Sequence, residues 1–413
     1  WVVRGQLWIG GARVPEKSLM SIVKQPLEAS APNSVIAFRD DSSAIRGRTV
    51  RLISAAEPLG PSPLVEQPVL LHPTLTAETH NFPSGVAPYP GAATGGGGRL
   101  RDNQAVGRGG LVCASGAAYC TGNLHIPGYP LPWEEDGWTH PPDLASPLEI
   151  LIEASNGASD YGNCFGEPLI YGFTRTFGLR LPEGYRSWYK PIMYSVGAGQ
   201  IRDEHTVKGA PQDGMLVVQV GGPAYRIGMG GGAASSMEQG ANVQELDFNA
   251  VQRGDPEMEQ RMNRLMRACV ELGQANPIVS AHDLGAGGDC NALPEIVEPA
   301  GAVIDLRAIP VGDKTLSVLE IWGNESQERN ALLIRPASLP VLEAMATREN
   351  VPLAVVGRVT GDGQLVLYDE RDDSRPVDLP LDDILGQLPP KRFDFERRSR
   401  QGQALPLPPA SDF

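Results

Sequence analysis

One helix and the strand after it constrain the fold of this chain more than any other segment. Asp255 can cap a helix that begins at Pro256, and apolar residues then recur at spacings of three and four. The helix is expected to end near Asn276-Pro277, before a strand. Strand-like segments occupy residues 215–220, 277–281, 302–306, 331–334, 354–356 and 365–367, and a second helix lies around residues 339–346. Interspersed helices and strands predict an α/β or α+β fold with mixed sheets.

The first half of the chain has weaker patterns. Residues 71–128 are dense in glycine and proline, so we expect loops between short strands there. Residues 148–154 have a short helical pattern, and small residues follow at 155–162. A boundary between two domains is expected near Lys190-Pro191.

Length and charge narrow the classes of function. The 413 residues suggest two or three domains, and 35 Lys plus Arg against 49 Asp plus Glu give a net charge of −14. An acidic surface repels phosphate backbones, so nucleic acid is not expected as a partner. No apolar run reaches the ~20 residues that a membrane span needs. Five cysteines without a C-x-x-C pair argue against a disulfide framework or zinc site and favour the cytosol.

The two ends suggest a piece of a longer protein. The chain begins at Trp1 without an initiator methionine, and it stops at Phe413 after a tail rich in proline and basic residues. We interpret residues 388–413 as a solvated linker. A nucleic-acid-binding arm is the less favoured alternative.

Residues 78–81 and 91–102 could together bind a phosphate. Successive glycines allow backbone N–H groups to approach phosphate oxygens, although glycines alone more often form a flexible hairpin. No Gly-Lys-Ser/Thr follows, so this is not a Walker A loop. Glu78 and Asp102 frame the glycines, and such carboxylates suit Mg²⁺ bound to nucleotide phosphates. His80 could be a general base, though a lone histidine is more often structural.

Three further segments are ambiguous. Residues 228–236 are small and allow either close packing, which we favour, or a second anion site. Asp283 enters a glycine turn from a strand, where an acid can ligate a metal or simply form the turn. Residues 325–329 are a polar run between apolar segments, and without context they indicate a solvated loop. No cysteine has neighbours that mark a nucleophile.

The order of these segments is more specific than any one of them. Residues 78–81, 91–102, 190–193, 228–237, 246–261, 282–288 and 321–329 follow one another as in one enzyme family. The chain resembles the phosphoribosylformylglycinamidine synthases, the glutamine-dependent enzymes of purine biosynthesis, in their long single-chain form. The resemblance runs from residue 1 to about 388. It implies the first synthetase half only, with a second half and a glutaminase domain beyond residue 413.

The resemblance implies a fold and a reaction. The fold is PurM-like, with an N-terminal domain at 1–189, a C-terminal domain at 190–387, each a mixed sheet covered by helices, and a tail at 388–413. The reaction converts formylglycinamide ribonucleotide to its amidine with ATP, Mg²⁺ and ammonia from glutamine. An amide oxygen is a poor leaving group until it is phosphorylated, and the developing charge needs Mg²⁺ and N–H donors.

The resemblance also assigns roles to individual residues. His80 matches the catalytic histidine, and Glu78, Asp102 and Asp283 match magnesium ligands. The residues that match the family's substrate contacts are Thr79, Asn81, Arg101, Gln252, Glu325, Ser326 and Gln327. The residues that match the family's nucleotide-binding segments are Gly91, Ala92, Ala93, Thr94, Gly95, Gly96, Gly97, Gly98, Arg99, Leu100, Arg101, Asp102, Tyr171, Gly172 and Phe173.

The chain also departs from the family pattern. Thr76 stands where many members have a lysine that contacts ATP, and Phe82 stands where many have a second histidine. A Ser-Glu-His-Cys motif with the other catalytic histidine would end just before Trp1, so we expect the fragment to be inactive alone. The alternative is a non-catalytic interaction protein derived from this enzyme, which the retained acids and His80 disfavour. Aminoimidazole ribonucleotide synthetase, another PurM-like enzyme, fits neither the length nor residues 325–329.

Overall fold

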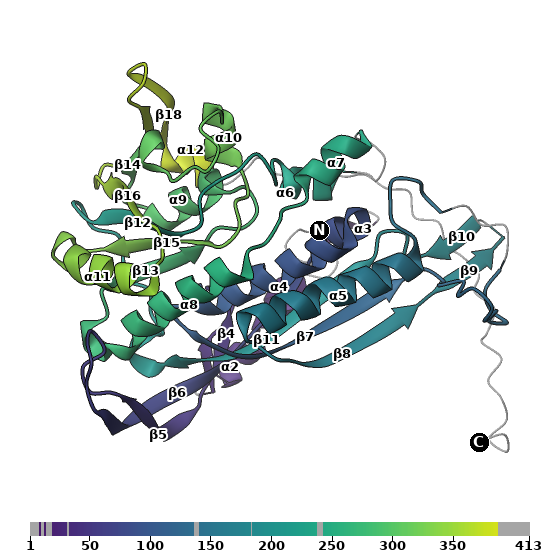
Figure 1. Ribbon diagram of the computed structural model, residues 1–413, viewed down its shortest axis with the longest axis horizontal. Coiled ribbons are helices and arrows are strands. Elements are labelled where there is room, and N and C mark those ends of the chain that lie inside the picture. Colours follow the sequence, from purple (N-terminus) through teal and green to yellow (C-terminus); the bar gives the residue numbers. More distant parts are fainter. Residues whose placement is uncertain are drawn as a thin grey trace.

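The described residues form two seven-stranded sheets, each covered by helices, and two short two-stranded sheets (Figure 1). The computed structural model describes residues 8–9, 12–13, 19–30, 33–135, 140–182, 184–237 and 243–386. Within these ranges each of the two large sheets contains one parallel pair among antiparallel ones, β7 with β8 and β14 with β17. The α/β class with mixed sheets is therefore confirmed. The predicted linker at 388–413 lies outside the described residues.

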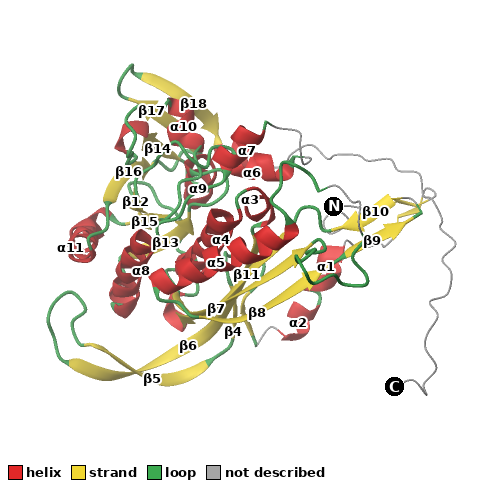
Figure 2. Ribbon diagram, turned by 45° about the vertical axis from the view of Figure 1, so that its right-hand side comes forward, coloured by secondary structure: helices red, strands yellow, loops and turns green. Residues whose placement is uncertain are grey.

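The first sheet has the order β3-β4-β6-β11-β7-β8, with β5 paired to β6. Its strands are β3 (Ser34–Ile36), β4 (Ser43–Ile45), β5 (Arg48–Ala55), β6 (Leu64–Thr79), β7 (Leu111–Thr121), β8 (Leu169–Thr176) and β11 (Ile192–Arg202). Helices α3 (Asn81–Val86), α4 (Pro88–Ala105) and α5 (Pro147–Phe165) cover one face (Figure 2). Shorter elements are α1 (Leu19–Lys24), α2 (Pro26–Ser30), the pair β1 (Trp8–Ile9) and β2 (Ala12–Arg13), and the pair β9 (Gly178–Leu181) and β10 (Gly184–Ser187).

The second sheet has the order β13-β15-β12-β16-β14-β17-β18. Its strands are β12 (Leu216–Gly221), β13 (Ile278–Asp283), β14 (Ala302–Asp305), β15 (Arg329–Ile334), β16 (Leu353–Val359), β17 (Gln364–Asp369) and β18 (Ser374–Pro380). Its helices are α6 (Gly231–Ser236), α7 (Gln244–Ala250), α8 (Pro256–Glu271), α9 (Asp289–Val297), α10 (Val318–Gly323), α11 (Leu339–Glu349) and α12 (Leu381–Leu385). Single 3₁₀ turns occupy Asp203–His205, Gly273–Ala275, Leu306–Ala308 and Pro336–Ser338.

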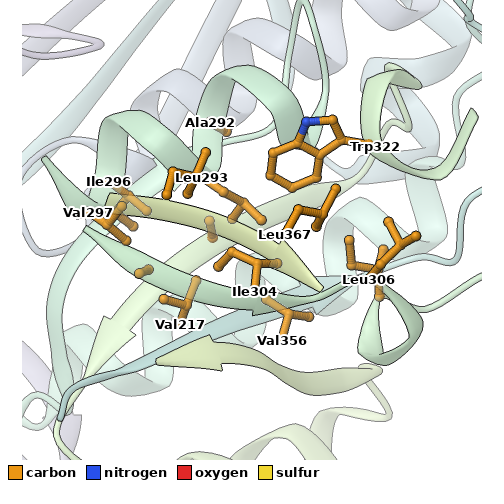
Figure 3. Packing of buried hydrophobic residues seen from close by; sticks show 14 of the residues in the cluster. Val217, Ala292, Leu293, Ile296, Val297, Ile304, Leu306, Trp322, Val356 and Leu367 are labelled. Carbon is orange, nitrogen blue, oxygen red and sulfur yellow. The ribbon is translucent and has the colours of Figure 1, made fainter. Parts of the chain in front are cut away.

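The central strand β12 is buried on both faces. Because side chains alternate along a strand, Leu216, Val218 and Val220 pack with α8 and α11 in one core cluster. Val217 points the other way, into a second cluster with residues of α9, α10 and β14 (Figure 3). This explains why the strand is a continuous apolar run in the sequence.

Helix α8 begins as predicted. The Asp255 carboxylate accepts hydrogen bonds from the backbone N–H groups of Glu257 and Met258, both at 3.1 Å. The helix ends at Glu271, before the expected Asn276, because Gly273 takes a left-handed conformation with φ of +59° and stops it.

The glycine-rich region differs most from expectation. The loops expected within residues 71–128 are wrong: β6, α4 and β7 are long, and residues 91–102 lie inside α4. Small residues let α4 approach its neighbours, since a Cβ on Gly91 would lie 2.3 Å from the Pro83 backbone. Interior helix N–H groups already donate to carbonyls one turn earlier. A phosphate cradle made of this glycine backbone is therefore also wrong.

Two other boundaries differ. Helix α5 continues through the small residues at 155–162, where a Cβ on Gly157 would lie 2.0 Å from the Tyr89 carbonyl oxygen of α4. Strand β11 pairs with β6 and β7 of the first sheet. The two sheets therefore divide between Arg202 and Leu216, later than the boundary predicted near Lys190-Pro191. No helix in the described part of the chain is long and apolar enough to cross a membrane.

Candidate functional site

A cavity of about 450 Å³ lies where the two sheets and their helices meet. Its walls come from the end of β6, the helices α3, α4 and α6, the end of β13 and the turn after it, and the segment before β15. The predicted site residues that line it, from the motifs or from the resemblance, are Glu78, Thr79, His80, Asn81, Thr94, Gly95, Gly98, Arg99, Arg101, Asp102, Gln252, Asp283, Glu325 and Gln327. A larger cavity of about 900 Å³ beside the β5–β6 turn contains none of the predicted site residues.

Some predicted residues do not line this cavity. They are Gly91, Ala92, Ala93, Gly96, Gly97, Leu100, Tyr171, Gly172, Phe173 and Ser326. Tyr171 is exposed on β8, at the edge of the first sheet. Ser326 lines a neighbouring cavity of about 290 Å³, which shares Gln252, Glu325 and Gln327 with the first. The nucleotide-binding role of residues 171–173 stays a prediction.

His80 is held at the point where β6 passes into α3. Its backbone N–H donates to the Met193 carbonyl at 2.9 Å, and its ring Nδ1 is hydrogen-bonded to the Gly91 carbonyl oxygen. Because a carbonyl only accepts, Nδ1 carries the proton and Nε2 keeps a lone pair. Burial lowers the pKa of His80, so the ring is neutral near pH 7 and able to accept a proton.

The predicted metal ligands form a crowded group of carboxylates. Burial, and then repulsion by Asp283, raises the pKa of Glu78 and raises that of Asp102 well above its usual range. Burial also raises the pKa of Asp283, as does the nearby Asp41. Asp41 was not predicted, since it lies in a loop before β4 that has no motif. Its carboxylate contacts the Lys208 ammonium at 3.1 Å.

These carboxylates suit a cation that also binds a ligand. Among the residues that the structure describes, no group of three or more His, Cys, Asp or Glu side chains could hold a metal ion unaided. Mg²⁺ typically takes one or two carboxylates and completes its shell with water and phosphate oxygens. Buried acids that repel one another provide the negative charge such an ion would neutralise. The residues therefore fit magnesium delivered with a nucleotide.

Glu325 closes another wall of the cavity. Its Oε1 accepts hydrogen bonds from the backbone N–H groups of Gly232 at 2.6 Å and Gly287 at 3.0 Å. Its Oε2 accepts one from Gln252 at 2.6 Å. The solvated loop expected at residues 325–329 is wrong, because Glu325 and its neighbours are buried. Close packing of residues 228–236 is confirmed, since a Cβ on Gly231 would lie 2.6 Å from the Glu325 carboxylate.

Arg101 is fully buried and joins the two halves of the chain. Its Nη1 donates to Glu259 Oε2 of α8 at 3.0 Å, and its Nη2 donates to Gln327. Gln104, one turn along α4, donates to the other Glu259 oxygen at 2.8 Å. Arg101 reaches the cavity wall as predicted, but the sequence did not indicate its partner Glu259, which lies 158 residues away.

Gly95 keeps His80 in place, which gives a test of the site geometry. A Cβ on Gly95 would lie 2.8 Å from His80 Cβ, so Gly95→Ala should displace the ring and lower the free energy of unfolding by about 1–3 kcal/mol. Gly96→Ala is the matched control, because its Cβ would meet nothing within 4 Å. It should raise that free energy by about 0.5–1 kcal/mol through helix propensity. Urea unfolding measures both, and equal shifts would refute the packing of Gly95 on His80.

Comparison with known proteins shows which proteins this chain is similar to. Residues 212–370 match the family model described as AIR synthase related protein, C-terminal domain. The probable phosphoribosylformylglycinamidine synthase of Arabidopsis thaliana is 53% identical over 99% of this chain and 30% of its own length. The Homo sapiens enzyme is 51% identical over 99% of this chain and 32% of its own. The chain is a relative of the phosphoribosylformylglycinamidine synthases. This confirms the resemblance inferred from the motifs.

A solved structure shares the fold of this chain. Thermotoga maritima PurL complexed with FGAR matches with a TM-score of 0.63 and 25% identity, over 80% of this chain and 48% of that chain. The PurM-like α/β fold is therefore confirmed. The chain spans about a third of the length of the curated relatives that it matches.

Proposed function

We propose that this chain forms the first synthetase half of a long phosphoribosylformylglycinamidine synthase. The observation that carries the proposal is that one cavity gathers Glu78, Asp102 and Asp283 with His80. In the proposed reaction, ATP phosphorylates the amide oxygen of formylglycinamide ribonucleotide, and ammonia then displaces phosphate from the iminophosphate. Identity above 50% to such synthases over nearly the whole chain supports this assignment.

The side chains of the cavity divide this work. Glu78, Asp102 and Asp283 would hold Mg²⁺, which neutralises phosphoryl charge when it is bound. His80 would accept a proton at Nε2 from the attacking ammonia, because its Nδ1–H is already committed to the Gly91 carbonyl. Arg101, Gln252 and Gln327 would orient the substrate from the opposite halves of the fold. Thr79, Asn81, Glu325 and Ser326 are proposed as further substrate contacts.

The ammonia would come from other parts of the same long chain. The relatives are about three times as long as this chain, which leaves room for a second synthetase half and a glutaminase domain. The name of the Arabidopsis relative places it in chloroplasts or mitochondria, and a cytosolic location for this chain stays a prediction.

Turnover by the complete protein that contains this chain tests the proposal. We expect ADP release only when formylglycinamide ribonucleotide, ATP, Mg²⁺ and either glutamine or ammonium are all present. Coupled spectrophotometric assay of ADP, with mass spectrometry of the amidine, measures it. A complete protein that binds no ATP and releases no ADP would favour a non-catalytic interaction protein instead. The 413-residue chain alone is expected to be inactive.

A further inference from the structure

Lys190 is an uncompensated positive charge at the cavity. Of the described lining residues, Arg99 is held by both oxygens of the buried Glu167, and Arg101 by Glu259. The His282 ring is also bonded to a carboxylate, Glu295, at 2.7 Å. Lys190 differs, because its Nζ donates to a backbone carbonyl, that of Ser235, at 2.7 Å. Within residues 33–135, 140–182, 184–237 and 243–386, no carboxylate lies within ion-pair distance of it.

Lys190 is also fixed in position. It lies two residues before β11, and the ring of the next residue, Pro191, packs on Gly85 of α3. The ammonium lies 5.6 Å from the centre of the Phe82 ring of α3 and reaches the Ser235 carbonyl near the end of α6. The side chain therefore bridges the two halves of the fold beside Gly231 and Gly232, which also line the cavity.

Lys190 is electrostatically separate from the carboxylates that line the same cavity. Burial raises the pKa of Glu78, Asp102 and Asp283; repulsion by Asp283 adds to this for Glu78 and Asp102, and repulsion by Asp41 adds to it for all three. Lys190 takes no part in that group: burial lowers the pKa of its ammonium, and no carboxylate offsets the effect. An anionic group bound at Lys190 would restore the balance of charge there.

We propose that Lys190 binds the 5′-phosphate of the ribonucleotide substrate. The inference rests on the proposed function, and it names a binding residue to which neither motif nor resemblance assigned a role. A nucleotide triphosphate carries its Mg²⁺ to the carboxylates, whereas a phosphate monoester without a metal would be repelled there. The two phosphate groups would therefore be held by different side chains of one cavity, with the reacting amide near His80, which also lines it.

A purely structural role is the competing explanation. Lys190 donates to the last turn of α6, and a cation in that place stabilises a helix end. Such a role would affect every ligand of the cavity alike. Binding of the phosphate would affect only ligands that carry it, which separates the two explanations.

The test compares formylglycinamide ribonucleotide with the same ribonucleoside lacking phosphate. Equilibrium binding of each to the complete protein is measured by calorimetry for the wild type, Lys190→Gln and Lys190→Arg, with turnover in parallel. A lost charge-assisted hydrogen bond should weaken ribonucleotide binding by about 10- to 100-fold in Lys190→Gln. Ribonucleoside binding and the KM for ATP should stay within about twofold, and Lys190→Arg should lose less. Lys314→Gln, at an exposed lysine outside the cavity, is the matched control.

The other outcomes overturn the inference in distinguishable ways. Equal weakening of both ligands would show that Lys190 only supports α6. A raised KM for ATP with unchanged discrimination between the two ligands would assign Lys190 to the nucleotide phosphates. A wild type that discriminates in binding but shows no turnover would refute the proposed catalysis while leaving the role of Lys190 supported.

Discussion

Glu259→Ala should lower the free energy of unfolding by about 3–5 kcal/mol, because it leaves the buried Arg101 guanidinium with only the more distant Glu328 carboxylate, at 3.9 Å. Neither Arg101 nor Glu259 exposes any of its side chain, and their ion pair spans 3.0 Å between α4 and α8. Gln104 would lose its acceptor as well. Since these partners join the two halves of the fold, we expect the loss to appear in global unfolding, measured with urea by fluorescence and circular dichroism.

The same helix offers a matched control for this prediction. Glu257 is two residues earlier on α8, with a side chain 74% exposed and paired with Arg261 one turn away. Glu257→Ala should cost only about 0.3–0.5 kcal/mol, since exposed pairs contribute little. The double variant Arg101→Met with Glu259→Leu should recover only part of the stability, because the buried Glu328 carboxylate, 3.9 Å from the guanidinium, then loses its cation. Equal effects of Glu257→Ala and Glu259→Ala would contradict the buried pair.

The second half of the fold could be predicted because its signals are local. The cap at Asp255, the apolar stripe of α8 and the run of β12 each lie within one element. The side chains that α8 and β12 pack against are also apolar, so the burial of apolar surface is enough to favour these elements. The helix end was missed by a few residues, because Gly273 ends a helix only in a conformation that the sequence does not reveal.

The prediction of loops in the glycine-rich half of the chain is wrong for a physical reason. Local propensity disfavours glycine in helices by about 1 kcal/mol per residue, which is why loops were expected. In α4 that cost is offset by contact, since Gly91, Gly95 and Gly97 let Pro83, His80 and Tyr161 approach. Those neighbours come from α3, the end of β6 and α5. Tertiary packing of this kind leaves no periodic pattern in the sequence.

The sequence predicted many residues of the site, but it did not predict the side chains with which they pair. The motifs named the acids and His80, because each lies in a recognisable segment. Lys190 and Glu259 lie in segments that the resemblance includes, but it gave them no role. Asp41 and Glu259 act through pairs distant in sequence, such as Asp41 with Lys208 across 167 positions. A charged residue in a loop or on a helix has the same appearance in a sequence whether it is solvated or faces a cavity.

Glu78→Gln and Asp283→Asn should each reduce ADP release by the complete protein by about 100- to 1000-fold without lowering its stability. Without a bound cation, the buried carboxylates repel one another, so removing one charge should leave the free energy of unfolding unchanged or higher. Lost activity with retained stability is the signature of a group kept for chemistry. Steady-state assays across a Mg²⁺ titration and urea unfolding measure the two effects.

A control on the same strand makes this result specific. Glu66 lies earlier on β6 with a half-exposed side chain paired to Arg51, so Glu66→Gln should change neither activity nor stability appreciably. Unchanged turnover in Glu78→Gln and Asp283→Asn would remove the metal assignment. Turnover that falls in step with the free energy of unfolding would make these acids structural. If a higher Mg²⁺ concentration restores the activity of these variants without changing their stability, the carboxylates bind the ion. The repulsion between them in the metal-free protein then destabilises the fold in exchange for a preformed ion site.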